Sequence, residues 1–553
     1  MNLKILLIVI DGASYKIMEQ IKERLPTLNK LIESGFYGKL ESVLPSLTPI
    51  ALASLVSGNL PEHNGITAPK IFLKGRPLSS PLSAFSSEGL KTDPVWVYLA
   101  KAGYKVTVTS NPQALPDKWG LKNTILFDPY KSKMKKCSDA RLIAEGENKI
   151  LNKVWLIEKR NSRYLIAYPS SNGEKEIELE EGEWSEPLEI YGKCGKEEFK
   201  GVTFLHARKN DIYVAPISFL NYKWGNVIEL QDKVWNNVVL KHGMILDGDY
   251  HSLNRELINF DEYIKTVELA YSFFLNYTVF MLENTNWDFA ITYLPIVDNL
   301  QHLLYGVDDE KAFNYIVKGY ELADEFVKAQ LDYADIVIVC SDHGIAKIRK
   351  KVFINKLLEK INVLKLKDND EIDWSKTKAY YGGGGQIRIN LKNREKNGIV
   401  SSKEFPKLVK YIVRNLENLV DEENNERIFT SIIERDTPAG DREGDIKITG
   451  IAENYGVSSL VKKDLNVIEK VKEYRMTSGE HGYFRKDDLY GIIIAYSKNV
   501  KVRKSYLNAK IIDVAPTILK LFNINTTNIK MDGKPIITLV EKYGTTNSYQ
   551  QKA

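Results

Sequence analysis

The sequence predicts an α/β protein with a doubly wound, mostly parallel sheet and a β-rich inserted cap. Near both ends of the chain, short apolar runs alternate with amphipathic helical stretches, which is the rhythm of βαβ units. Between about residues 130 and 250 the pattern changes to short alternating segments with Gly and Asn turns. We therefore expect core segments at 1–128, 256–345 and 476–553, the cap at 129–255, and a second, irregular insertion at 346–475.

The first core segment contains two expected strands and two expected helices. Ile5–Ile10 is apolar throughout and predicts a strand that is buried on both faces. Residues 25–34 and 48–56 have helical periodicity, and the first of these stretches stops at Gly35. Residues 104–110, YKVTVTS, predict another strand. This order is typical of a parallel sheet with helical crossovers.

The expected cap consists of short, alternating segments such as VWLIEK, RYLIAYP, VTFLHA and DIYVAPI. It also holds four of the 8 Trp residues, Trp155, Trp184, Trp224 and Trp235. Period-two alternation between turn residues predicts antiparallel strands. We expect this insertion to shape substrate access.

The α/β pattern returns after the cap. A long amphipathic stretch at about 261–283 leads to the apolar run Phe289–Leu294, which predicts a helix and then a strand. Two further helices, the second at about 309–330, precede the strand Ile336–Cys340. The last core segment holds a strand at 490–496 and a helix at 513–521.

Composition excludes several classes of protein. Lys+Arg 77 against Asp+Glu 72 gives a net charge of +5, too even for a basic nucleic-acid-binding arm. The 3 Cys residues are too few and too scattered for a disulfide framework or a Cys-based zinc site. The first apolar run is shorter than a signal h-region, and no stretch approaches the ~20 apolar residues of a membrane span. We expect a cytoplasmic protein that acts on a small molecule without a membrane partner; the oligomeric state stays open.

Residues of metal-ligand type stand at the ends of the expected strands. They are Asp11 after the first strand, Asp298 and His302 after FAITYL, Asp342 and His343 in SDHG, and His481 in SGEHGYF. In open α/β sheets, ligands bind outside the carboxyl ends of the strands. Asp298 and His302, at (i, i+4), share one helix face.

Each of these residues taken alone has a simpler explanation. Asp11 after a strand is commonly a turn or capping residue, a DxxxH pair is often a solvated helix face, and DH before Gly is often a turn. However, three of the 7 His residues stand in motifs of this one kind, and together they favour a metal site over the simpler explanations. His63, His206, His242 and His251 have no such context. Asp and His ligands together suit two divalent ions, Zn²⁺ or Mn²⁺.

Thr48 is the candidate nucleophile. Pro49 suits the first position of a helix, so Thr48 would be the N-cap, and a capping role alone is the simpler interpretation. A helix N-terminus also binds phosphate, and a metal-bound hydroxyl is easier to deprotonate for attack on phosphorus. Ser46, Ser54 and Ser57 are alternatives without this combination.

The motifs together resemble the alkaline phosphatase superfamily, in particular type I phosphodiesterase/nucleotide pyrophosphatase-like proteins and the predicted phosphohydrolase/phosphomutase branch. The resemblance runs in order through VIDG, LPSLTP, SGNLPEHNGI, DNLQH, SDHG, GEHGYF and DVAPTILKLF…MDGKPI. The stretches GGGGQIRINLKNREKNGIV and ERIFTSIIERD resemble the phosphohydrolase branch. The resemblance covers about 1–125 and 260–540, and the expected cap lies outside it.

The resemblance implies two metal sites and a covalent mechanism. One ion would bind Asp11, Thr48, Asp342 and His343, and the other would bind Asp298, His302 and His481. Two such ions clamp the attacking and leaving oxygens of an in-line displacement. Thr48 would form a phospho-threonine, which water then hydrolyses.

Some positions depart from the family pattern. Diesterase members carry an Asn shortly after the HGI-like segment, where this chain reads GITAPK. Asn64 or Lys70 could substitute as the substrate-binding residue, although Lys70 also fits a solvated surface position. The TPIAL segment has no Arg and argues against a sulfatase, and Thr48 argues against a phosphoglycerate mutase, which uses Ser.

The glycine run 382–385 resembles a phosphate-cradling loop in composition only, because no helix follows it. A bulge or a close backbone approach at a strand start explains it more simply. The sequence thus predicts a two-metal phosphohydrolase of phosphate diesters or monoesters. The alternatives are a phosphoryl transferase or phosphomutase of the same fold, and a catalytically inactive binding protein.

Overall fold

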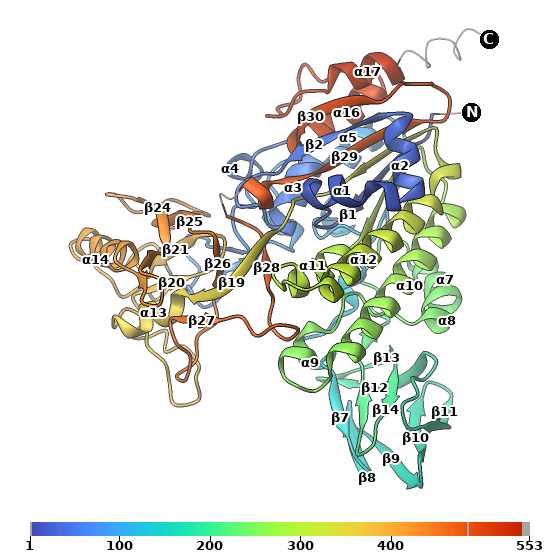
Figure 1. Cartoon of the computed structure of the whole chain (residues 1–553), viewed down its shortest axis with the longest axis horizontal. Helices are drawn as coiled ribbons and strands as arrows, with labels where there is room; N and C mark the ends of the chain where they lie inside the picture. Colours follow the sequence, from blue (N-terminus) through green and yellow to red (C-terminus); the bar gives the residue numbers. More distant parts are fainter. Residues whose placement is uncertain (1–2, 115, 484–485, 545–553) are drawn as a thin grey trace.

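A computed structural model describes residues 3–114, 116–483 and 486–544. Eight strands form the central mixed sheet, in the order β30-β2-β29-β18-β1-β17-β5-β6 (Figure 1). The parallel part consists of β1 (Ile5–Ile10), β17 (Phe289–Leu294), β18 (Ile336–Cys340), β5 (Val106–Val108) and β6 (Thr124–Leu126). The remaining strands are β2 (Phe36–Glu41), β29 (Tyr490–Ser497) and β30 (Ser505–Lys510). Strand β29 runs antiparallel to both of its neighbours, β2 and β18.

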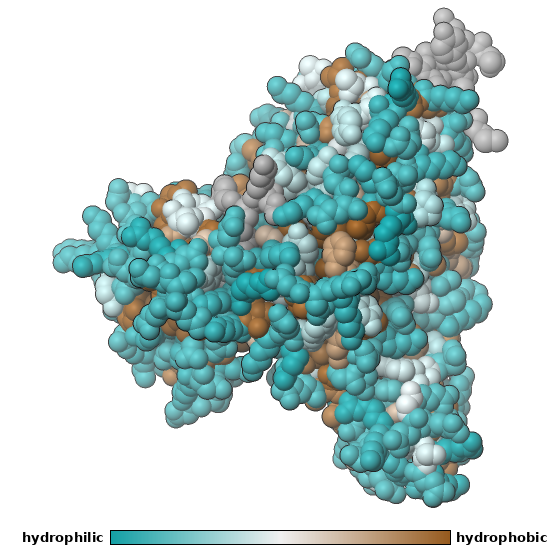
Figure 2. Space-filling model, viewed as in Figure 1, coloured by the Kyte–Doolittle hydropathy of each residue, from teal (hydrophilic) through white to brown (hydrophobic). Residues whose placement is uncertain are grey.

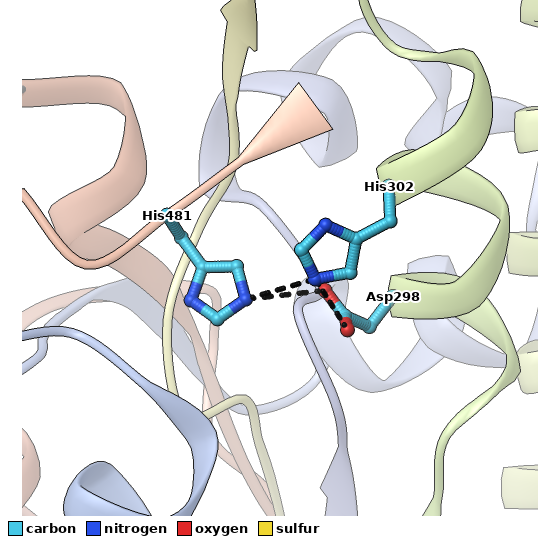
Figure 3. Close-up of side chains that lie close together, drawn as sticks. All are labelled: Asp298, His302 and His481. Atoms are coloured by element: carbon cyan, nitrogen blue, oxygen red, sulfur yellow. Dashed lines mark hydrogen bonds and ion pairs between the residues drawn. The ribbon is translucent and has the colours of Figure 1, made fainter. Parts of the chain in front are cut away.

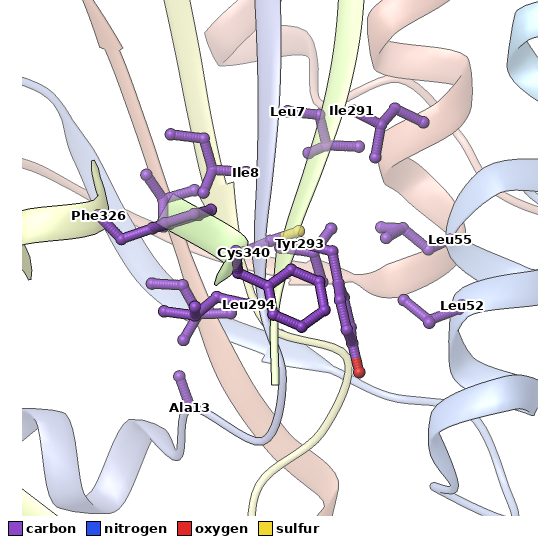
Figure 4. Packing of buried hydrophobic residues seen from close by; sticks show 14 of the residues in the cluster. Leu7, Ile8, Ala13, Leu52, Leu55, Ile291, Tyr293, Leu294, Phe326 and Cys340 are labelled. Carbon is purple, nitrogen blue, oxygen red and sulfur yellow. The ribbon is translucent and has the colours of Figure 1, made fainter. Parts of the chain in front are cut away.

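The three central strands have the bounds that their apolar runs predict. Every residue of β1, β17 and β18 is buried, because both faces of this sheet are covered. Leu7 and Ile291 point toward Leu52 and Leu55 of α3 (Thr48–Ser57), whereas Ile8 points to the opposite face (Figure 4). Strand β5 is shorter than its predicted range, 104–110.

Helices pack in two groups on the sheet. One group comprises α1 (Tyr15–Ile21), α2 (Pro26–Glu33) and α12 (Glu310–Lys328), and the other comprises α3, α5 (Val95–Lys101) and α16 (Val514–Leu521). The long helix α10 (Phe260–Asn284) packs on β17 and on α11 (Ile296–Leu304), and α17 (Ile537–Gly544) packs on α16. Short elements near the edge are α4 (Pro61–Asn64), β3 (Lys70–Ile71), β4 (Leu82–Ser83), α6 (Pro116–Trp119) and α15 (Lys486–Leu489).

The β-rich insertion forms three small antiparallel sheets with a hydrophobic core of their own. Its strands are β7 (Arg141–Ile143), β8 (Gly146–Ile150), β9 (Lys153–Arg160), β10 (Arg163–Ser170), β11 (Gly173–Glu180), β12 (Leu188–Cys194), β13 (Glu197–Thr203), β14 (Leu205–Ala207), β15 (Ile212–Val214) and β16 (Ser218–Phe219). The three cysteines were expected to be too few and too scattered for a disulfide framework, and the sequence did not predict the one disulfide that two of them form. Cys137 and Cys194 are bonded, with Cα atoms 5.9 Å apart across a separation of 57 residues.

The strands of this insertion end earlier than the sequence pattern predicts. Residues beyond Phe219 form α7 (Ile228–Val234), α8 (Leu240–His242) and α9 (Tyr250–Asn254). Trp224 and Trp235 belong to the main hydrophobic core and not to the core of the β-rich lobe. The stretch is amphipathic, and its apolar side packs on the α/β core.

The second insertion is regular, which corrects the expectation of an irregular region. A four-stranded antiparallel sheet, β20-β21-β25-β24, and two helices enclose a third hydrophobic core. The elements are β19 (Ala346–Phe353), α13 (Ile354–Lys360), β20 (Ala379–Tyr381), β21 (Gln386–Ile389), α14 (Phe405–Glu417), β22 (Val420–Asp421), β23 (Glu426–Arg427), β24 (Phe429–Glu434), β25 (Ile446–Ile451), β26 (Asn454–Ser458), β27 (Ile468–Lys470) and β28 (Gly479–Glu480). Figure 1 shows this lobe and the β-rich lobe projecting from the core in different directions.

The surface is mostly hydrophilic on the face shown in Figure 2, with hydrophobic residues visible mainly between the second insertion and the core. Among the described residues, none of the helices is both long and apolar enough to cross a membrane.

Candidate metal centre

The candidate ligands converge at the carboxyl ends of the central strands. Asp11 directly follows β1, and Asp342 and His343 follow β18. Asp298 and His302 lie on α11, which begins two residues after β17. His481 follows β28 and reaches the same place from the second insertion's return to the core. Parallel strands thus bring together residues that lie hundreds of positions apart in the chain.

One group contains Asp298, His302 and His481 (Figure 3). His302 Nε2 lies 3.2 Å from Asp298 Oδ2 and 3.1 Å from His481 Nε2. His302 Nδ1 donates to the Gly479 carbonyl at 2.8 Å, and His481 Nδ1 donates to the Ser46 carbonyl at 2.6 Å. These backbone bonds leave both Nε2 lone pairs directed at one point, the usual arrangement of metal-ligating histidines.

A second group surrounds His343. Its Nε2 lies 3.4 Å from Asp11 Oδ1, 3.3 Å from Asp342 Oδ2 and 3.2 Å from Thr48 Oγ1. The His343 ring stacks on that of His481, with centroids 3.5 Å apart. The second ligand-type cluster contains Asp11, Asp298 and His343, so Asp298 belongs to both groups. The sequence motifs had placed Asp298 in one group only.

The charge balance of the site is unfavourable without a cation. Asp11 Oδ1, Asp298 Oδ1 and Asp342 Oδ2 are buried and have no hydrogen-bond partner among the described residues. Burial and the charges of Asp342 and Asp298 raise the pKa of Asp11 well above its usual value. Burial likewise raises the pKa of Asp342, and the carboxylate of Asp298 adds to the shift. Three carboxylates in one buried site therefore need positive charge to stay ionised.

Burial and the neighbouring charges also shift the pKa values of the histidines. Burial opposes protonation of His302, but the adjacent Asp298 outweighs it and raises the pKa of His302 to about 9. Burial and the neighbouring His343 lower the pKa of His481 well below its usual value. A neutral His481 is the form that binds a metal. Unpaired carboxylate oxygens beside the neutral His481 imidazole fit divalent cations.

Thr48 is the first residue of α3, and Leu47 occupies the N-cap position. The prediction of Thr48 as the N-cap is therefore wrong by one residue. Its hydroxyl contacts His343 Nε2. Ser46 instead positions the loop, because its Oγ accepts from the Gly482 N–H at 3.0 Å. Ser54 and Ser57 are fully buried within α3.

The two candidate substrate-binding residues have different environments. Asn64 is 0% exposed, and its amide donates to Ser54 Oγ and to the Asn59 carbonyl, both at 3.0 Å. Its Oδ1 accepts from the Ile66 N–H at 2.8 Å. Asn64 therefore holds a turn, and the structure gives it no access to a substrate. Lys70 is half-buried and lines a cavity beside His302.

Two cavities adjoin the candidate ligands. The first, of about 430 Å³, is lined by Thr48, Asp11 and Asp298 together with apolar and aromatic side chains such as Phe85 and Tyr130. The second, of about 540 Å³, is lined by His302, His481, Lys70, the turn at 382–384 and residues 457–459. Asn299 is the one residue that lines both cavities in the described part of the chain.

The second insertion, and not the β-rich lobe, borders the site. None of the described strands β7 to β16 contributes a lining residue to either cavity. Only the flanks of that lobe do so, through residues such as Tyr130 and Asp247. The insertion expected at 129–255 therefore reaches the cavities through the residues that flank its strands, and not through its sheets.

Tyr293 is a site residue that the motifs did not reveal. It donates a hydrogen bond to Asp11 Oδ2 from within β17. The signal was a phenol one residue before the end of a fully buried strand.

The chain belongs to the type I phosphodiesterase / nucleotide pyrophosphatase family, which it matches over residues 5–484; this family is part of the alkaline phosphatase superfamily. No curated protein sequence matches the chain.

The fold is similar to that of ectonucleotide pyrophosphatase/phosphodiesterase 5. The murine protein matches with a TM-score of 0.50, 12% identity, and coverage of 98% of this chain and 99% of that chain. The human protein matches with a TM-score of 0.47, 13% identity and the same coverage. A third match, with a TM-score of 0.49 and 12% identity over the same shares, is an inactive murine variant in complex with AMP. At these identities the likeness concerns the fold alone.

Proposed function

We propose that the protein is a divalent-metal-dependent phosphodiesterase in which Thr48 is the covalent nucleophile. The observation that carries this proposal is the position of Thr48 Oγ1, 3.2 Å from His343 Nε2, beside three buried carboxylates with unpaired oxygens. A hydroxyl at the start of a helix also lies where backbone N–H groups favour an anion. Family membership supports hydrolysis of phosphoric esters.

Two ions would be held by the two groups described above. Asp298, His302 and His481 would bind one ion, and Asp11, Thr48, Asp342 and His343 would bind the other, with Asp298 between them. The donor atoms fit Zn²⁺ or Mn²⁺. Bound ions would neutralise the phosphate oxygens and lower the pKa of the Thr48 hydroxyl.

The protein's own residues then position the reaction. Thr48 Oγ forms a bond to phosphorus while the bond to the leaving oxygen breaks and that oxygen keeps the electron pair; the hydroxyl proton passes to solvent. Water then replaces Thr48 at phosphorus, so that the net change is addition of H₂O across one P–O bond. Tyr293, which donates to Asp11 Oδ2, fixes the orientation of that carboxylate.

A diester fits the site better than a monoester does. A phosphate monoester carries one organic group, whereas the candidate ligands stand between two cavities of about 430 and 540 Å³. An in-line displacement at phosphorus needs room on both sides of the reacting atom. The first cavity, with exposed Phe85 and buried Tyr293, suits a retained group with an apolar, planar part.

The test compares bis(p-nitrophenyl) phosphate with p-nitrophenyl phosphate, using protein whose metal content is measured by elemental analysis. We expect up to two bound ions per chain, loss of activity on chelation, recovery with Zn²⁺ or Mn²⁺, and a preference for the diester. Turnover that survives complete metal removal contradicts the proposal. A clear preference for the monoester contradicts the diester assignment, and phosphate passing to an acceptor alcohol instead of water identifies a transferase.

A further inference from the structure

A buried glutamine joins the helix of one ligand group to the turn of the other. Gln301 lies on α11, next to the candidate ligand His302, and is 0% exposed. Its Nε2 donates to the Gly12 carbonyl at 2.7 Å, and Gly12 directly follows the candidate ligand Asp11 in the turn after β1. This hydrogen bond therefore ties α11 to the turn that carries Asp11, across 289 positions of the chain.

Gly12 stands against the carboxylates of two other candidate ligands. Its N–H donates to Asp342 Oδ1 at 3.1 Å. Its φ is 67°, and a Cβ added there would lie 2.7 Å from Asp298 Oδ1, so the turn and α11 approach each other at a distance that only glycine allows. Any shift of Gly12 relative to α11 therefore changes the separation of Asp11 from Asp298.

Tyr320 of α12 fixes the orientation of the Gln301 amide. Its hydroxyl donates to Gln301 Oε1 at 2.8 Å and accepts from the Ser14 N–H at 2.8 Å. The amide oxygen therefore faces Tyr320, and the NH₂ group faces Gly12. Because Ser14 belongs to the same turn as Gly12, the pair Gln301–Tyr320 holds this turn at two points. Tyr320 is also 0% exposed, so these hydrogen bonds form in a region of low dielectric constant.

Packing alone does not favour a glutamine at this position. Leu300, Leu303 and Leu304 of the same helix are buried and apolar. Ordering a glutamine side chain costs more conformational entropy than ordering a leucine, and its hydrogen bonds contribute little net free energy of folding. A buried polar network instead specifies one arrangement of the elements that it joins. Here that arrangement is the placement of α11 against the turn after β1.

We propose that Gln301 is a positioning residue that sets the separation of the two groups of candidate ligands, with Tyr320 holding its amide in place. The inference rests on the proposed function, in which each group holds one ion. Paired ions of this kind stand roughly 3.5–4 Å apart, and a misplacement of about 1 Å costs on the order of 10²-fold in rate. Of the described residues, those that line the two cavities do not include Gln301, so it acts through the ligands and not on the substrate.

The test replaces Gln301 with Met, which has a similar volume but no amide. Electron paramagnetic resonance of protein loaded with Mn²⁺ measures the magnetic coupling between the two ions, which depends on their separation. We expect Gln301→Met to bind two ions with an altered coupling. Because Gln301 does not contact the substrate, kcat for bis(p-nitrophenyl) phosphate should fall roughly 10- to 100-fold while KM changes by less than about 3-fold. Tyr320→Phe keeps the packing of the ring, and it should alter the coupling and lower kcat by about 3- to 10-fold.

The matched control is Gln330→Met. Gln330 is likewise 0% exposed; it accepts from Thr292 Oγ1 at 2.7 Å and donates to the Phe326 carbonyl at 2.8 Å. The same substitution therefore removes two similar hydrogen bonds, neither of which involves a candidate ligand or the turn after β1. Both Met variants should lower the midpoint of urea unfolding by similar amounts, but Gln330→Met should leave the Mn²⁺ coupling and kcat unchanged.

An unaltered coupling and kcat in Gln301→Met, or the same changes in Gln330→Met, overturn the positioning role. Wild-type protein that binds two coupled ions but hydrolyses no diester refutes the proposed function, and the coupling in the variants then still decides whether Gln301 sets the separation of the ligand groups. Wild-type protein that binds fewer than two ions when saturated with Mn²⁺ refutes the two-ion arrangement and the positioning role with it.

Discussion

The two halves of the candidate metal centre differ in how the fold holds them. His343 is 0% exposed at the end of the central strand β18, and Asp11 is almost as deeply buried after β1. His302 keeps 30% of its side chain exposed on α11 and faces a cavity formed with the second insertion. The half around His343, which we call the rigid half, also contains the proposed nucleophile Thr48, and the half around His302 is the more open one.

The largest expected effect comes from the rigid half. Thr48→Ala removes the nucleophile, so kcat should fall on the order of 10³-fold or more, whereas Thr48→Ser should keep part of the activity. Steady-state hydrolysis of a p-nitrophenyl diester measures both. Elemental analysis should still find metal in the Ala variant, because three ligands of that half remain. Undiminished turnover by Thr48→Ala would show that Thr48 is not the nucleophile.

Replacing one histidine in each half should measure separately what that side chain contributes to the free energy of unfolding and to metal affinity. His343→Ala deletes a fully buried ring and should cost roughly 2–3 kcal/mol in the metal-free protein. His302→Ala deletes a partly exposed ring and its ion pair with Asp298, so it should cost less than about 1 kcal/mol only at about pH 10, above the folded pKa of His302, although each variant loses affinity for metal. Urea unfolding in chelator gives the first quantity, and metal titration gives the second. Equal unfolding costs would show that the halves are equally rigid.

The smallest expected effect is a pH dependence in the metal-free protein. The pKa of Asp11 is raised in the folded state, so its contribution to stability is full below the unfolded pKa and is lost as pH rises toward the folded one. Asp11→Asn mimics the protonated form and should stabilise the metal-free protein by roughly 1–3 kcal/mol at pH 8 and by less at pH 5.

The matched control for this prediction is Asp298→Asn. Burial alone would raise the pKa of Asp298, but the charge and hydrogen bond of His302 outweigh it and hold the pKa below its usual value. This carboxylate therefore stabilises the fold above its unfolded pKa, and its neutralisation should destabilise the metal-free protein at pH 8. Thermal unfolding in chelator at both pH values distinguishes the two; a shift of the same sign for both variants contradicts the charge balance described here.

The sequence patterns predicted those elements whose conformation and burial depend on residues close together in the chain. The strands β1, β17 and β18 match their apolar runs residue for residue, because burial on both faces demands continuous hydrophobicity. Because Asp11 and Asp342 each follow a predicted strand of the sheet, the sequence also predicted that they lie in one region.

Long-range packing explains what the sequence did not reveal. Cys137 and Cys194 are brought together by the folding of the β-rich lobe. Asn64 was a candidate substrate-binding amide, but three nearby polar groups occupy it. Asp298 belongs to both ligand groups only because α11 lies between them. The second insertion borders the site through residues of several elements, and no spacing in the sequence records that contact.

The sheet order sets a constraint on synthesis of the chain. Among the described residues, strand β2, near the N-terminus, pairs only with β29 and β30, which emerge from the ribosome near the end of translation. At roughly 5–20 residues per second, its backbone groups wait on the order of tens of seconds for their partners. His481 is also made late, so the two candidate ligand groups are complete only when almost the whole chain is available. A bound pair of ions would therefore report that the chain had been completed and folded.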